Sequence, residues 1–175
     1  MHQRLKIFIN CAIFLIIAVN VCFAANFGLS KAKIRLVVAP GESQAGDIKV
    51  ENTSGEPINV RAYLEDWSYA PPFDGSKNFA PAKSSPLSAA DFISFAPSEF
   101  IVPPYGSKTV NYVVRIPENA KGGYYSVMFF ETGLGKYNQP ADLNAQSREV
   151  GIDIALRLAS LFYIEVKGAS ELKAD

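Results

Sequence analysis

The longest regular pattern of apolar and polar residues lies near the carboxyl end, from Arg148 to Val166. Apart from Ser160, apolar residues take every second place, and a period of two predicts a β-strand rather than a helix. At about 3.3 Å per residue this stretch spans roughly 60 Å, whereas an ordinary strand spans about 17–20 Å. We therefore expect part of the strand to run past the core, or to bend, and to offer its apolar stripe to something else.

Shorter alternating stretches predict the remaining strands. They cover residues 33–39, 47–52, 58–67, 92–95, 100–102, 108–116 and 124–131, with a further short edge strand around 77–79. The stretch 124–131 is apolar on both faces, so we expect it at the centre of a sheet. Trp67 and Tyr69 lie on the parity opposite to the apolar residues before them, which predicts a bulge or a sheet crossing near residues 65–66.

Turn-forming residues separate these strands at close intervals. Proline, glycine and serine are frequent between residues 70 and 91, and residues 132–147 are polar and predict a loose connection before the last strand. No convincing helix follows the first 24 residues. With the two short stretches on either side of Pro97 counted together, seven or eight strands with regular turns predict an all-β chain that folds as an immunoglobulin-like antiparallel β-sandwich.

The first residues of the chain have the composition of a cleavable secretory signal peptide. Arg4 and Lys6 precede an apolar run, and the small residues Cys22 and Ala24 fit cleavage after Ala24. An uncleaved anchor is the alternative, since the apolar run is near the short end for crossing a bilayer. We therefore predict a signal peptide at 1–24, one immunoglobulin-like domain at 25–167 and a short tail at 168–175.

Charge and residue types exclude several functions for the part after residue 24. Removal of Arg4 and Lys6 leaves 15 basic against 17 acidic residues, which does not favour nucleic acid or an anionic membrane as a partner. Both cysteines and the single histidine lie within residues 1–24, so neither a catalytic triad nor an ordinary zinc site can be built from the rest. Glu65 and Asp66 are neighbours on a strand and point to opposite faces. We predict a protein that is not an enzyme and needs no cofactor, metal or small-molecule substrate.

Between about residues 34 and 166 the chain contains, in this order, the stretches IRLVVAPGES, GDIKVENTSGEPINVRAYLEDW, DGSKNFAPA, SPLSAADFI, PSEFIVPPYGSKTVNYVVRIP, GGYYSVMFFE and GIDIALRLASLFYI. In their order and spacing they resemble the N-terminal immunoglobulin-like domain of bacterial periplasmic pilus-assembly chaperones, the PapD-like group. The resemblance implies that the last strand completes an unfinished immunoglobulin fold in a secreted, pilin-like subunit. It also implies a periplasmic location and an outer-membrane usher as a further partner.

The chemistry of such strand donation is simple. A subunit that lacks its final strand has open backbone donors and acceptors beside an apolar groove, and a lent strand supplies both hydrogen bonds and side chains. The positions that match the family's donor residues are Ile152, Ile154 and Leu156, with Val150 as a further candidate. The alternative interpretation places these four side chains in the ordinary core of their own domain.

The family also holds the carboxylate of its subunit between two basic side chains, one on the first strand and one on the last. Arg35 occupies the matching place on the first strand. On the last strand the matching residue is Ser160, and the nearest cation is Arg157, whose odd parity points it away from the apolar stripe. Arg35 and Arg157 are therefore the candidate anchors, and the alternative for both is a solvated charge on a sheet face.

The resemblance leads to a predicted function and leaves one competitor. We expect a periplasmic chaperone-like domain that binds pilus or fimbria subunits by donating its last strand. The competitor is a non-catalytic adhesion or envelope-structural module with the same sandwich. The family's chaperones carry a second immunoglobulin-like domain, and the sequence given stops at Asp175, so a truncated chaperone and a stand-alone relative both remain open.

Overall fold

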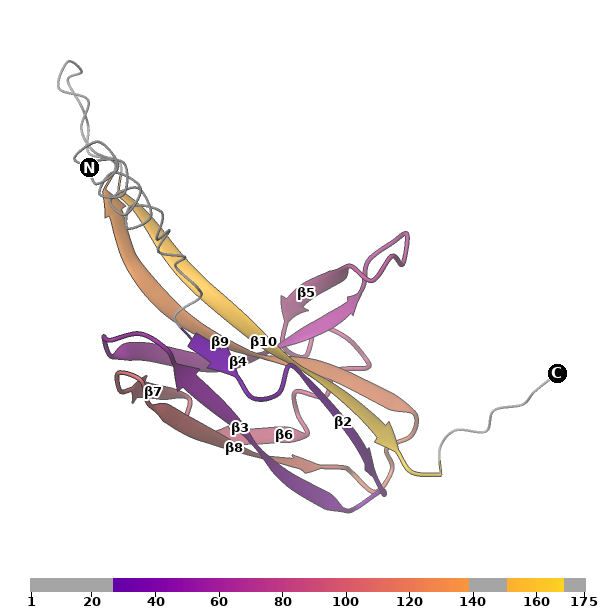
Figure 1. Ribbon diagram of the computed structural model, residues 1–175. Coiled ribbons are helices and arrows are strands. Elements are labelled where there is room, and N and C mark those ends of the chain that lie inside the picture. Colours follow the sequence, from indigo (N-terminus) through magenta and orange to yellow (C-terminus); the bar gives the residue numbers. More distant parts are fainter. Residues whose placement is uncertain (1–26, 139–150, 169–175) are drawn as a thin grey trace, which may run out of the picture.

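The computed structural model describes residues 27–138 and 151–168, and the regular elements in these two ranges are all β-strands. They form two sheets (Figure 1). The first sheet contains, in spatial order, β1 (Phe27–Leu29), β3 (Ser43–Asn52), β8 (Ser107–Arg115) and β6 (Ile93–Ala96). The second contains β2 (Lys33–Val38), β10 (Gly151–Val166), β9 (Gly123–Asn138), β4 (Ile58–Tyr69) and β5 (Lys77–Pro81), with β7 (Glu99–Val102) also paired to β4. The predicted all-β antiparallel sandwich is confirmed, with one parallel pair between β2 and β10.

The inner faces of the two sheets meet in one core. Strands β2, β3 and β8 bury alternate residues, and the two sheets touch where the ring of Tyr112 meets the ring of Phe162 edge-on at 5.0 Å. Ile48, Val110 and Phe130 are also fully buried there. Because each large apolar side chain contributes about 1.5–3 kcal/mol when it is fully buried, this core is the main source of stability. The central position predicted for 124–131 is confirmed, since β9 lies between β10 and β4.

Strand β4 runs straight through Trp67 and Tyr69, without the predicted bulge or crossing. Its pairings with β9 and β5 keep one register. Trp67 lies on the outer face of the second sheet, where it forms a separate apolar cluster, and its neighbour Asp66 is buried. The buried carboxylate of Asp66 accepts hydrogen bonds from the backbone of Ser85 and from two serine hydroxyls, which removes the cost of an unpartnered buried charge. The predicted bulge assumed that Trp67 and Tyr69 share a face with the apolar residues before them, whereas the strand keeps its register and Trp67 lies on the opposite face.

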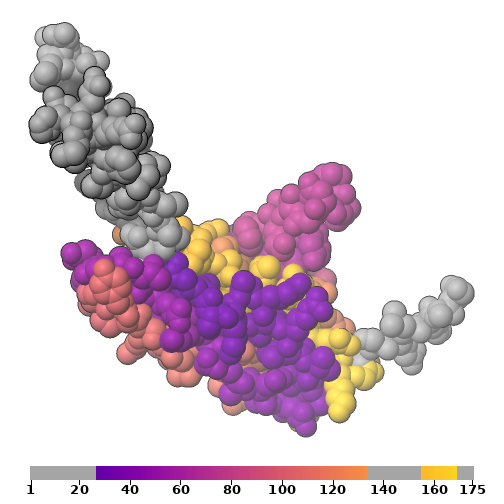
Figure 2. All heavy atoms as spheres, in the orientation of Figure 1, coloured from indigo at the N-terminus to yellow at the C-terminus, as the bar shows by residue number. Residues whose placement is uncertain are grey.

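Two further elements differ from the predicted strands. Strand β1 was not predicted, and β9 continues to Asn138, through residues expected to be a loose connection. In this region β9 is held by pairing with β10 rather than by an apolar pattern of its own, so the local sequence carries little signal. The short edge strand expected around 77–79 is present as β5, and Figure 2 shows the magenta part of the chain around it projecting from the sandwich.

Strands β9 and β10 continue side by side beyond the other strands of their sheet (Figure 1). Strand β4 pairs with β9 only as far as Glu131, whereas β10 pairs with β9 up to Asn138. We call residues 132–138 of β9 and 151–156 of β10 the arm. Part of the last strand therefore runs past the other strands of its sheet, as expected.

Candidate strand-binding site

Strand β10 has two halves that differ in what pairs with them. The trailing half, Leu161–Val166, lies between β9 and β2 and is hydrogen-bonded on both edges. The leading half, Gly151–Ser160, is paired with β9 on one edge, and within residues 27–138 and 151–168 no strand pairs with its other edge. Such an edge is a template for a strand from another chain.

One hydrogen bond shows which peptide groups of β10 face the open edge. The amide of Leu161 donates to the carbonyl of Ala32, on the side of β10 where β2 lies, at 3.0 Å. Successive peptide groups in a strand point to opposite edges, so the peptide groups of Ala155 and Arg157 share that direction. They face the edge where the described part of the chain supplies no strand.

The four predicted donor residues fall at the leading half or just before it. Val150 lies outside the described residues. Ile152 and Ile154 belong to β10 and pair with β9, but their side chains also lie outside what is described. Leu156 is half-buried and packs against the main core, as Leu158 does. The core therefore uses part of the Leu156 side chain.

Arg157 lies on the outer face of the second sheet, as its parity predicts. Its Nη1 donates to Oε1 of Glu65 at 3.1 Å and to the hydroxyl of Tyr63 at 3.2 Å, and its guanidinium carbon lies 3.6 Å from the ring centre of Phe129. Burial by itself lowers the pKa of Arg157, but the Tyr63 hydrogen bond and the charges of Glu65 and Glu131 outweigh it and raise that pKa. The side chain is charged and already has partners.

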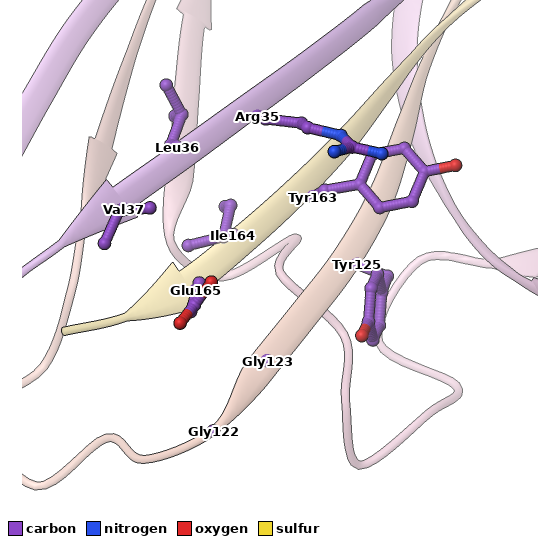
Figure 3. Close-up of a pocket in the computed structure, with 9 residues that line it drawn as sticks. All are labelled: Arg35, Leu36, Val37, Gly122, Gly123, Tyr125, Tyr163, Ile164 and Glu165. Atoms are coloured by element: carbon purple, nitrogen blue, oxygen red, sulfur yellow. The ribbon is translucent and has the colours of Figure 1, made fainter. Parts of the chain in front are cut away.

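Arg35 is exposed on β2, and its guanidinium carbon lies 5.7 Å from the ring centre of Tyr163 (Figure 3). The two side chains line an open cavity of about 510 Å³, together with Tyr125 and Glu165. Gly123, which lies opposite Glu165, also lines this cavity. It presents a cation, two phenol rings and a carboxylate on the outer face of the sheet.

The structure does not bring Arg35 and Arg157 together. Arg35 pairs with Tyr163. Tyr163 is six residues beyond Arg157 on β10, which corresponds to about 20 Å at about 3.3 Å per residue. One carboxylate cannot bridge that distance. Ser160, the residue that matches the family's second cation, is buried, and its hydroxyl donates to the carbonyl of Lys31. The structure therefore does not place Arg35 and Arg157 where one carboxylate could contact both, and the anchor role of each residue stays a prediction.

An aromatic layer on the outer face of the second sheet was missed by the sequence reasoning. The rings contact one another mostly edge-to-face, which is a favourable geometry. Burial and a hydrogen bond with Tyr69 raise the pKa of Tyr163 to about 12, although the charge of Arg35 lowers it. The signal in the sequence was that aromatic residues take the outward parity on several strands. These residues are Tyr63, Trp67, Tyr69, Phe79, Tyr125, Phe129 and Tyr163.

Metal-binding clusters and membrane-spanning helices are both absent from the described residues. No group of three or more histidine, cysteine, aspartate or glutamate side chains comes together there in a way that could hold a metal ion. Within the same residues, no helix has the length and apolar character needed to cross a membrane.

Solved structures share this architecture. The seventh PapD-like domain of human CEP192 matches with a TM-score of 0.50 and 12% identity, over 87% of this chain and 94% of that chain. A chain of a chaperone–tip adhesin complex, described as vital for activation of CFA/I fimbriae biogenesis, matches with a TM-score of 0.51 and 17% identity, over 82% of this chain and 57% of that chain. The chain has a PapD-like, immunoglobulin-like fold.

A third PapD-like structure is the complex of the Salmonella enterica SafA pilin with the SafB chaperone. It matches with a TM-score of 0.51 and 9% identity, over 84% of this chain and 57% of that chain. The present chain therefore spans about 57% of the matched chains from both fimbrial complexes. No family model and no curated protein matches the sequence. The likeness is one of fold, and the structures that share it are named as chaperones and PapD-like domains rather than as enzymes.

Proposed function

We propose that this PapD-like domain is a periplasmic chaperone of the pilus-assembly type, which binds a secreted, strand-deficient subunit along the leading half of β10. One observation carries the proposal. Over Gly151–Ser160 the described strands pair with one edge of β10 only, so the other edge has peptide groups with which a client strand can pair. Two structures with the same fold come from complexes of a chaperone with an adhesin or a pilin, which supports the assignment.

In this proposal the two parts of the interaction have separate sources. Main-chain hydrogen bonds from the open edge provide affinity, and the alternating side chains of Val150, Ile152, Ile154 and Leu156 enter the apolar groove of the client. Arg35 supplies a single cation for the client carboxylate, without a second one from β10. Neither ATP nor a metal is required, since the energy comes from folding of the client.

A proline at Ala155 tests the open edge. It removes the amide that faces this edge and leaves the hydrogen bonds between β10 and β9 in place, and edge strands accept proline at such positions. We expect the tagged full-length chain to co-purify from the periplasm with a small secreted subunit in equimolar amount. The amount of subunit recovered with Ala155→Pro should be lower by about tenfold or more. Ala155→Ser, which keeps the amide, is the matched control. Undiminished capture by a folded proline variant would rule out strand addition here.

A charge at Ile154 tests the side-chain part of the proposal. Ile154→Asp places a carboxylate in an apolar groove, so we expect loss of the subunit while the urea unfolding midpoint stays close to that of the parent. Ile154→Val keeps an apolar side chain and should retain the subunit. If Ile154→Asp instead unfolds the domain, the side chain belongs to its own core and does not donate.

A second candidate is a non-catalytic adhesion or envelope-structural module. The match to a PapD-like domain of human CEP192 favours it, because that domain is named without reference to fimbriae and is covered almost completely. The same co-purification separates the two functions. A structural module should be recovered alone or with envelope polymer, and Ala155→Pro should then change nothing.

A further inference from the structure

We propose that Arg157 is a positioning residue. It fastens the root of the arm to the outer face of the sandwich, and so sets how firmly the arm holds a client strand. This inference rests on the function proposed above. It assigns Arg157 a task different from the carboxylate anchor that its charge first suggested.

Arg157 lies where the arm leaves the rest of the sheet. Arg157 pairs with Glu131 of β9, and Glu131 pairs in turn with Arg61 of β4. This is the last row of the sheet in which β10, β9 and β4 are joined. Beyond it, within the described residues, the arm consists of β9 and β10 alone. The direction of the arm is therefore decided at this row.

The side chain of Arg157 contacts residues of β4, β5 and β9. Through Glu65 and Tyr63 it is bonded to β4, and the hydroxyl of Tyr63 donates to Oε2 of Glu131 on β9 at 2.7 Å. Its guanidinium carbon also lies over the rings of Phe129 and Phe79, at 3.6 and 5.8 Å from their centres. One planar cation thus ties β10 to β9, β4 and β5, a geometry that lysine cannot reproduce.

A two-stranded ribbon has little stiffness of its own, which is why a fastened root matters. Such ribbons twist strongly and are marginally stable in water. The arm also contains a register shift at Ile154 and Ala155, and bulges of this kind bend a strand. An arm that is already held in its binding direction loses less freedom when a client docks, so it binds more tightly.

The partly exposed ion pair by itself would not justify this role. The side chains of Arg157 and Glu65 are 36% and 21% exposed, and exposed ion pairs contribute little. The close stacking on Phe129 adds to the ion pair, because cation–π contacts gain strength as the cation loses water. The combination of stacking and two directed hydrogen bonds fixes an orientation, which a single ion pair does not.

Hydrogen exchange on the full-length chain tests the positioning role without a client. We expect Arg157→Met to speed exchange of the arm amides that bond to β9, by about tenfold, while amides of β3 and β8 in the other sheet stay protected. Arg157→Lys keeps the charge and should restore part of the protection. Arg115→Met is the matched control, since Arg115 is exposed on β8 of the other sheet. Arg115→Met should change neither the exchange of the arm amides nor that of the β3 and β8 amides.

Client retention is the second readout. Subunit co-purified with Arg157→Met should dissociate about tenfold faster on dilution than subunit bound to the Arg115→Met control. Unchanged arm exchange would overturn the inference, and so would faster arm exchange with unchanged dissociation. Faster exchange throughout the sandwich would make Arg157 a general stability residue and overturn it as well. Each of these outcomes is separate from the Ala155→Pro result, which tests strand addition itself.

Discussion

The two halves of β10 share one pattern of apolar and polar residues but have different surroundings. In the trailing half, Phe162, Ile164 and Val166 are 0–2% exposed, and β9 and β2 pair with both edges. In the leading half, Leu156 and Leu158 are only half-buried, and the described strands pair with one edge. A period of two therefore fixes which side chains share a face. It does not tell whether that face, or the edge beside it, is covered.

Truncation of one apolar residue in each half should give the largest contrast. Phe162→Ala removes a fully buried ring from between the sheets and should lower the free energy of unfolding by about 3–5 kcal/mol. Leu156→Ala, at a half-buried site, should cost about 1 kcal/mol. Urea unfolding followed by tryptophan fluorescence measures both. Equal costs would show that the two halves are buried alike.

The boundary between the halves should be sensitive to one hydroxyl. Ser160 is buried and donates to the carbonyl of Lys31, just before β2 begins to pair with β10. Ser160→Ala leaves that carbonyl without its partner, so we expect a loss of about 1 kcal/mol in the free energy of unfolding. Ser160→Thr keeps the hydroxyl and is the comparison variant. No loss with alanine would mean that the β2 junction is held by backbone pairing alone.

Alkaline pH should lower the stability of the domain through Tyr163 in the trailing half, and this is the smallest of the expected effects. The pKa of Tyr163 is raised to about 12 by burial and by the hydrogen bond with Tyr69, against about 10 in an unfolded chain. A raised pKa means that the fold favours the neutral phenol. Its contribution is full below pH 10 and is lost as pH rises toward 12. Between pH 9 and pH 11 the parent should lose more stability than Tyr163→Phe, by less than about 1 kcal/mol because the ring is partly exposed.

The unfolding midpoints of the parent and of Tyr163→Phe, measured at both pH values, decide this last prediction. Tyr63 and Tyr112 also have raised pKa values, the first chiefly through burial and a hydrogen bond to Glu131, the second chiefly through burial. They act in the same direction in both proteins and cancel in the comparison. An equal loss of stability in the two proteins would mean that Tyr163 does not contribute to the alkaline response.

The sequence predicted the site in part. The outward parity of Arg157 followed from alternation along one strand, and the structure places its side chain on that face. Leu156 was expected to be offered to a partner, and part of its side chain packs against the core of its own domain. The stacking of Arg157 on Phe129 could not be predicted, because it joins residues on different strands whose register is set by the whole sheet. The prediction of a bulge near Glu65 was wrong for a related reason. Alternation cannot show that a second apolar cluster covers the outer face.

The all-β sandwich and the long apolar stripe of the last strand can both be derived from the sequence, which also places the single histidine and both cysteines within residues 1–24. The point at which β2 begins to pair with β10 depends on the tertiary fold, and this point sets which stretch of the stripe has one edge without a described partner. The physical reason is distance along the chain. Side-chain alternation is a local property of the backbone, whereas edge coverage depends on segments such as Lys31 and Ser160, which lie 129 residues apart in the sequence.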